Sequence, residues 1–194
     1  GSDKDLLTAR TEGGRLVRFS GCDSLTSVTI PNSVTSIGKF AFSGSGLTSV
    51  TIGSGVTTIG EYAFSNTKLT SVTLPDVTKV GDYAFGSAKQ ITAVTLGELK
   101  EIGEYAFFET AITTLPVFTA KTEIGRYAFA FTAITEVTVP DKMEVAEGVF
   151  SECTKLTTVT VGNDVKLGKY AFGMDKDTAF KVERTEIGGK RYFY

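Results

Sequence analysis

The amino-acid sequence predicts an α/β solenoid, a stack of similar coils that each contribute a short parallel strand and a short helical or irregular segment. A block of about 22 residues recurs along most of the chain. Apolar and polar residues alternate at the start of each block, and a motif of the form Ile-Gly-x-Tyr-Ala-Phe follows after a turn. A fixed period in this range indicates coils that bury their apolar faces only against neighbouring coils.

The seven blocks follow one another at steps of 22 residues, with one step of 21, and begin at Leu25, Leu47, Leu69, Ile91, Ile112, Ile134 and Leu156. In the second block, residues 49–52 alternate between polar and apolar side chains, as expected of a strand with one buried face. A turn is expected at 53–55, and Ile59 then points back into the core. Residues 61–64 are too few for an independent helix and are predicted to form a single helical or 3₁₀ turn. Residues 65–68 return the chain to the next strand.

Stacking places the equivalent aromatic residues of successive blocks in two rows. One row is expected to form a buried spine and consists of Phe42, Phe64, Phe85, Phe107, Phe129, Phe150 and Phe172. The second row is interrupted by Gly148 and consists of Phe40, Tyr62, Tyr83, Tyr105, Tyr127 and Tyr170. We interpret the second row as an edge of the core, with hydroxyl groups that reach solvent or backbone. The alternative is a strip on which sugar rings stack.

The block from Leu25 to Phe42 resembles the leucine-rich repeat of the BspA-like, treponemal type. It reads Leu-Thr-Ser-Val-Thr-Ile-Pro-Asn-Ser-Val-Thr-Ser-Ile-Gly-Lys-Phe-Ala-Phe. That repeat usually carries a cysteine shortly after Ala-Phe, and Cys22 and Cys153 occupy this position. Other blocks depart from the pattern here and carry Gly46, Lys68, Ala111 or Ala133. The resemblance covers about residues 16–172.

The resemblance implies a curved, right-handed superhelix with a parallel sheet on its concave face and helical, 3₁₀ or irregular segments on its convex face. Members of the family are typically surface or secreted proteins of bacteria and some protozoa, and several are adhesins. We therefore expect a non-catalytic module outside the cell or at its surface. The expected partner is a protein, either of the host matrix or of another cell surface, and a glycan is possible.

The chain is expected to divide into a repeat region at 25–178 and two capping segments. Residues 1–24 comprise a cloning scar, Gly1-Ser2, and a half-coil that contains Leu16, Val17 and Phe19. Residues 179–194 are expected to form a degenerate last coil around Phe180, Val182 and Ile187. Tyr192-Phe193-Tyr194 is either its lid or the cut end of a longer chain.

Composition and charge argue against several classes of function. A net charge of −2 and a pI near 5.3 give no general basic surface for nucleic acid or anionic membranes. No apolar run approaches the roughly 18 residues needed to cross a bilayer. An export signal that had been removed would not be visible. Cys22 and Cys153 lie six coils apart, on the order of 29 Å, which excludes a disulfide between them. Both are expected to be buried packing thiols.

No residue pattern points to catalysis or to a cofactor. The sequence contains no histidine, its two cysteines are too far apart to share a metal, and it has no glycine-rich phosphate loop. Acidic residues precede several of the tyrosines, but basic residues interrupt their row, which indicates a solvated face of mixed charge. The row contains Lys39, Glu61, Asp82, Glu104, Arg126, Glu147 and Lys169.

The candidate partner-binding residues are those that depart from the repeat. Phe108 and Phe131 replace small or polar residues of other coils, and Phe118 follows Pro116 on the exposed register of the sheet. Large aromatic side chains at positions that the fold does not constrain are candidate interface anchors. The alternative is local packing of irregular loops.

Other functions remain open. The strands expose mainly serine and threonine, which suit exposed strand positions and would also form a hydroxyl array like that of ice-binding solenoids. A structural spacer that presents another domain is a second possibility, and carbohydrate binding by the tyrosine row is a third.

Overall fold

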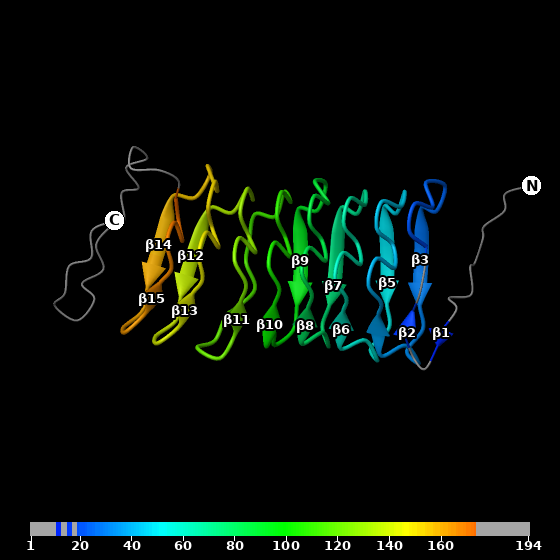
Figure 1. Ribbon diagram of the computed structural model, residues 1–194, viewed down its shortest axis with the longest axis horizontal. Helices are drawn as coiled ribbons and strands as arrows, with labels where there is room; N and C mark the ends of the chain where they lie inside the picture. The colour runs from blue at the N-terminus through cyan, green and yellow to red at the C-terminus, as the bar shows by residue number, and fades with distance from the viewer. Residues whose placement is uncertain (1–10, 13–14, 17–18, 174–194) are drawn as a thin grey trace, which may run out of the picture.

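The protein is a parallel-strand solenoid, described by a computed structural model for residues 11–12, 15–16 and 19–173. The coils stack side by side from one end of the molecule to the other, and equivalent strands of neighbouring coils run in the same direction (Figure 1). Each coil contributes one strand of four residues and one of two residues, except the fifth coil, which lacks the longer strand.

The longer strands are those that the alternating pattern predicts. They are β3 (Ser27–Ile30), β5 (Ser49–Ile52), β7 (Ser71–Leu74), β9 (Ala93–Leu96), β12 (Glu136–Val139) and β14 (Thr158–Val161). They pair in parallel as β3–β5, β7–β9 and β12–β14, and equivalent residues of the two coils face each other. Their valine, isoleucine and leucine side chains point inward, and the alternate residues, mainly serine and threonine, point outward. The expected strand is thus confirmed in six of the seven coils.

A second row of strands was not predicted. It consists of β4 (Ser36–Ile37), β6 (Thr58–Ile59), β8 (Lys79–Val80), β10 (Glu101–Ile102), β11 (Glu123–Ile124), β13 (Glu144–Val145) and β15 (Lys166–Leu167). With β1 (Thr11–Glu12) and β2 (Arg15–Leu16) the first five form a seven-stranded sheet in the order β1-β2-β4-β6-β8-β10-β11. Only β1 and β2 pair antiparallel in this sheet. Strands of two residues are too short to show an alternation of polar and apolar side chains. The sequence therefore indicates that Ile59 points inward but not that it lies in a strand.

The segments that follow these short strands are successive turns, and the described residues contain no helix. Tyr62 has a φ of 55°, the left-handed value that interrupts a helix, and the Ala63 N–H donates to the Gly60 carbonyl as in a type II turn. The Tyr62 and Phe64 N–H groups instead donate to the next coil, to the carbonyls of Asp82 and Ala84 at 2.9 and 2.7 Å. The helical or 3₁₀ turn that the sequence predicts over residues 61–64 is therefore not confirmed.

The core is the predicted phenylalanine spine. Six of its rings are almost fully inaccessible to solvent, and each stacks on the ring of the next coil at centroid distances between 5.2 and 5.8 Å. Phe19 extends the stack at one end, 5.4 Å from Phe42, and Phe172 extends it at the other end, 5.4 Å from Phe150. The residues expected to form the last coil, and Val17 of the first half-coil, lie outside the described residues. The handedness and curvature of the superhelix stay predictions.

The two cysteines have different environments, and the expectation for Cys22 is wrong. Cys153 is buried, with its Sγ 3.2 Å from both Thr132 Oγ1 and the Phe129 carbonyl, and burial raises the pKa of its thiol. Cys22 is exposed. The reason is its place at the end of the stack, where the described residues provide a neighbouring coil on one side only.

Truncation of a spine residue should destabilise the whole stack. Phe85 is fully buried between two stacked rings, so Phe85→Ala should lower the free energy of unfolding by about 3–5 kcal/mol. Phe40 is 42% exposed and stacks on one ring, so Phe40→Ala should lower it by about 1 kcal/mol. Urea denaturation followed by circular dichroism measures both, and equal losses would contradict the assignment of Phe85 to a continuous core.

Candidate functional site

The fifth coil departs from the others where its longer strand should be. Pro116 has no N–H group to donate to a neighbouring strand, and β9 and β12 on either side are not paired through this coil. Val117 is 89% exposed, although the alternation predicts that it points inward. Phe118 is 7% exposed instead and packs against Phe129 at a ring distance of 5.8 Å.

The expectation that Phe118 is an exposed anchor is therefore wrong, and the length of the coil does not explain why. Ile112 and Glu123 of β11 are 11 positions apart, but the first two coils have the same spacing and keep their longer strands. Pro116, in contrast, stands where those coils carry threonine, and Val117 turns outward directly after it. Phe118 then lies five residues before β11, the same place that the buried Val139 has before β13.

Phe108 and Phe131, by contrast, do meet at the surface. Their ring centroids are 5.3 Å apart at 68°, and Phe108 also meets the edge of Tyr105 at 5.4 Å and 75°. Phe108 is half-buried and Phe131 is 49% exposed. We call Tyr105, Phe108 and Phe131 the aromatic cluster. Neither Pro116 nor Phe118 has a ring contact with this cluster among the described residues, so the structure joins two of the four predicted site residues.

The backbone at Phe131 is unfavourable for a bulky residue. Its φ is 59°, and the equivalent residues of earlier coils share this left-handed conformation. Those residues are Gly44, Asn66, Ser87 and Glu109. Glycine and asparagine adopt the conformation readily, whereas a phenylalanine there is strained. Strain combined with exposure is typical of residues kept for function rather than stability.

A ladder of stacked rings runs beside the aromatic cluster. This tyrosine ladder consists of Phe40, Tyr62, Tyr83, Tyr105 and Tyr127, with centroid distances of 4.9, 4.8, 4.6 and 5.2 Å and interplanar angles of 13° or less. Gly148 ends the ladder, because a Cβ there would lie 2.2 Å from Tyr127 Cε1. The faces of the inner rings are covered by their neighbours. A sugar ring needs a free aromatic face, so the covered faces support the interpretation of these rings as a core edge. Tyr170, the last residue of the predicted row, is 48% exposed and stacks on no ring among the described residues. Sugar stacking there stays a prediction.

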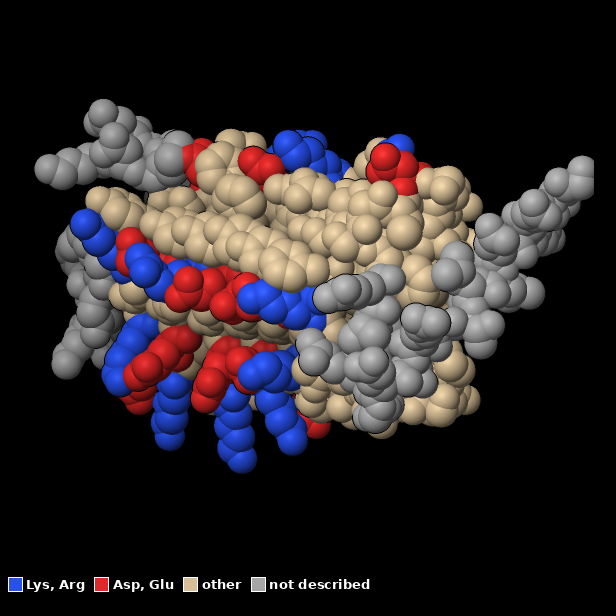
Figure 2. Space-filling view, turned by 45° about the vertical axis from the view of Figure 1, so that its right-hand side comes forward, with Lys and Arg blue, Asp and Glu red and all other residues tan. Residues whose placement is uncertain are grey.

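Charged side chains form rows parallel to the ladder. Figure 2 shows acidic and basic side chains side by side along the stack. Lys39 pairs with Glu61 and Arg126 pairs with Glu147, each at 2.7 Å, and the Tyr127 hydroxyl donates to Glu147 Oε1 at 3.2 Å. A further row along the short strands includes the ion pairs Lys79–Glu101 and Lys166–Glu144. The interpretation of this surface as a face of mixed charge agrees with these pairs.

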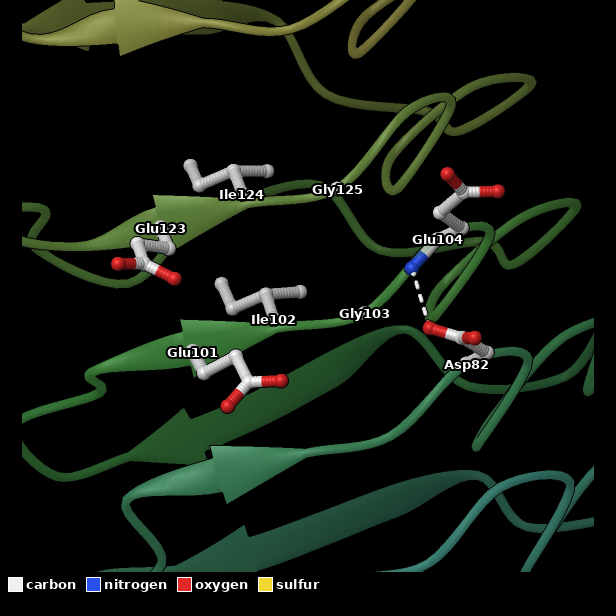
Figure 3. Close-up of a pocket in the computed structure, with 8 residues that line it drawn as sticks. All are labelled: Asp82, Glu101, Ile102, Gly103, Glu104, Glu123, Ile124 and Gly125. Atoms are coloured by element: carbon white, nitrogen blue, oxygen red, sulfur yellow. Dashed lines mark hydrogen bonds between the residues drawn. The ribbon is translucent and has the colours of Figure 1, made fainter.

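A shallow, open depression lies between the two charged rows (Figure 3). The carboxylates around it come from the short strands at Glu101 and Glu123 and from the turns at Asp82 and Glu104. The Glu104 N–H donates to Asp82 Oδ1 at 2.8 Å, which orients that carboxylate within the protein (Figure 3). Across residues 19–173, no group of three or more acidic, cysteine or histidine side chains is arranged to hold a metal ion.

The environment of the ladder affects the ionisation of two phenols. Burial is the main reason that the pKa of Tyr83 lies above its ordinary value, and the neighbouring Tyr105 and Tyr62 add to it. Burial also raises the pKa of Tyr127, and the hydrogen bond to Glu147 raises it further. Both phenols are therefore neutral at physiological pH.

Comparison with known proteins supports the resemblance noted in the sequence. A family model described as the BspA type leucine rich repeat region, in six copies, matches residues 17–131 and 60–179. No curated protein sequence matches the chain. The described part of the chain contains no helix that is long and apolar enough to span a membrane.

The solved structures to which this chain is similar are distant from it in sequence. A leucine rich cell surface protein from Faecalibacterium prausnitzii is 23% identical, with a TM-score of 0.46 over 81% of this chain and 61% of that chain. A leucine-rich repeat protein from Bacteroides ovatus is 19% identical, with a TM-score of 0.42 over 81% of this chain and 67% of that one. The pneumococcal vaccine antigen PcpA is 15% identical, with a TM-score of 0.39 over 81% of this chain and 70% of its own.

The different environments of Phe118 and Phe131 can be tested through stability. Phe118→Ala opens a cavity beside Phe129 and should lower the free energy of unfolding by about 3 kcal/mol. Phe131→Ala removes a half-exposed ring from a strained position and should change it by about 1 kcal/mol or less. Urea denaturation of the two variants measures the difference. A larger loss for Phe131→Ala would show that this ring is part of the core.

Alkaline titration tests the environment of the ladder. The pKa of Tyr127 is higher in the folded chain than in the unfolded chain, where it is about 10. The neutral phenol therefore stabilises the fold below about pH 10, and this contribution is lost as the pH rises through the folded pKa. The difference in tyrosinate absorbance between the native chain and its Tyr127→Phe variant isolates this group. Its midpoint should lie above that of urea-unfolded chain and should fall in Glu147→Gln. Coincident native and unfolded curves would contradict this assignment.

Proposed function

Because the chain belongs to the family of BspA-type leucine-rich repeat proteins, we propose that it is a non-catalytic module that binds another protein at the cell surface or outside the cell. The observation that carries this proposal is the aromatic cluster, in which Phe131 is both exposed and strained. Neither burial nor backbone preference accounts for a phenylalanine at this position.

The cluster has the properties of an interface anchor. Aromatic side chains dominate the binding energy of protein interfaces because they bury a large area while losing few rotamers. Phe108 supports Phe131 from the neighbouring coil through an edge-to-face contact, so the exposed ring is held in place before a partner arrives. A pre-organised anchor of this kind reduces the entropy lost on binding.

The chemistry of the chain supports a binding role over catalysis. The sequence has no histidine, and Glu61, Glu101 and Glu147 of the mixed-charge rows pair with cations. The net charge of −2 offers no general attraction for nucleic acid. The proposed partner is therefore a protein, of the host matrix or of another cell surface.

A binding assay with matched variants tests the proposal. The chain is immobilised and exposed to a panel of purified extracellular matrix and microbial surface proteins, and affinities are measured by biolayer interferometry. Wild-type chain should bind at least one of them, and Phe131→Ala and Phe108→Ala should each weaken that interaction about tenfold or more, as hot-spot truncations do.

Phe40→Ala is the matched control, because Phe40 is a similarly exposed aromatic residue at the far end of the ladder. It should leave the affinity unchanged. A partner whose binding responds to Phe40→Ala but not to Phe131→Ala would place the interface elsewhere. A glycan array with specific hits, together with no protein binding, would favour the carbohydrate-binding alternative instead.

A further inference from the structure

The tyrosine ladder brings four phenols from four successive coils into one continuous stack. Tyr62, Tyr83, Tyr105 and Tyr127 are 21 or 22 residues apart in sequence, yet their ring centroids are 4.8, 4.6 and 5.2 Å apart. The rings of each pair are parallel to within 13°. All four side chains are only partly buried, so their edges remain accessible from solution.

This arrangement suits the coupling of phenoxyl radicals. When a tyrosine loses one electron and one proton, part of the unpaired spin lies on the ring carbons next to the hydroxyl, in orbitals perpendicular to the ring. A parallel ring on the next coil presents the same orbitals along the line of the new bond. Partners that are held side by side by the fold react far faster than partners that must meet by diffusion.

A carboxylate beside the ladder can accept the proton that one phenol releases on oxidation. The Tyr127 hydroxyl donates a hydrogen bond to Glu147 Oε1 at 3.2 Å. Loss of an electron from a phenol makes its proton strongly acidic, and a carboxylate at hydrogen-bond distance accepts that proton without a diffusing base. Tyr127 is therefore the position at which oxidation of the ladder is easiest, and the stacked Tyr105 is its neighbour.

We infer that Tyr62, Tyr83, Tyr105 and Tyr127 form a site of oxidative modification, at which neighbouring coils become joined by dityrosine. Two one-electron oxidations, by a haem peroxidase with peroxide or by another one-electron oxidant, convert two adjacent phenols to phenoxyl radicals with release of two protons. The radicals form one carbon–carbon bond between the two rings, and the two ring hydrogens then move to the oxygens to restore both phenols. The product lacks two hydrogen atoms relative to the starting chain.

Such a link would tie coils together along the axis of the solenoid. Repeat proteins depend on contacts between neighbouring coils, and a covalent link between two coils restricts the unfolded chain in the same way as a disulfide. The modification does not depend on the identity of any binding partner, so it stands or falls independently of the proposed interface.

The experiment uses the intact chain at low concentration, oxidised briefly with photogenerated tris-bipyridyl ruthenium(III) and persulfate. The monomer is isolated by size-exclusion chromatography, and dityrosine is measured by its fluorescence and located by mass spectrometry of peptides. We expect links within the monomer between Tyr62 and Tyr83, Tyr83 and Tyr105, or Tyr105 and Tyr127. The same oxidation in urea should lower the yield of these three links at least tenfold, because the stack is lost.

Tyrosine-to-phenylalanine variants keep the stacked rings and so separate chemistry from folding. Tyr105→Phe removes a partner from two of the three pairs and should lower the yield of links within the monomer about threefold. Tyr170→Phe is the matched control, because no other tyrosine stacks on Tyr170 among residues 19–173, and it should leave that yield unchanged. Glu147→Gln should reduce the link between Tyr105 and Tyr127 and spare the link between Tyr62 and Tyr83.

Two results would overturn the inference. One is an equal yield of the ladder links in the folded and the urea-unfolded chain. The other is a folded monomer in which Tyr170 is linked as often as the ladder tyrosines, since random collisions rather than the stack would then select the partners.

Discussion

The parallel register between coils is the constraint on which the rest of this structure depends. Backbone N–H groups of one coil donate to carbonyls of its neighbour, as at Tyr62 and Phe64, and hold the coils near the strand spacing of about 4.8 Å. Residues of the paired strands and of the two aromatic rows therefore lie next to their counterparts in adjacent blocks. Equivalent aromatic rings at this spacing stack, as Tyr62 does on Tyr83, and opposite charges pair along the axis, as Lys39 does with Glu61. Stability thus comes from repeated contacts between equivalent residues rather than from a compact centre.

The sequence pattern predicts those parts of the fold that burial dictates. The alternation over 49–52 and the regular spacing of the phenylalanines reflect side chains that face the core, and the structure confirms both. The short strands were missed because two residues, such as Thr58 and Ile59, contain no alternation to detect. The left-handed turns were missed for a different reason, since hydrophobicity carries no information about φ. A signal was present nevertheless, because Gly148 stands in the tyrosine row and Gly44 in the row of Phe131.

The candidate site shows the same division. Phe108 and Phe131 were found as departures from the repeat, and the structure places both side chains at the surface. Phe118 was also a departure, but it is buried, whereas Val117 before it points outward. Pro116 interrupts the strand at this point because it has no backbone donor. A count of residues between Ile112 and β11 does not reveal this change, because the first two coils have the same count and keep their longer strands.

In a repeat protein, the backbone strain at one residue can be compared with the conformation of the equivalent residues in the other coils. The left-handed turn at Phe131 is required by the coil and not by the phenylalanine, since Gly44 and Asn66 adopt it with little strain. Tyr62, Tyr83 and Tyr105, at left-handed positions of their own, each gain two stacked neighbours in return. Phe131 gains one edge contact and leaves about half of its surface in water. Stacking within the chain therefore accounts for these three tyrosines but not for Phe131, and this difference is what favours a binding role for the aromatic cluster and a structural one for the ladder.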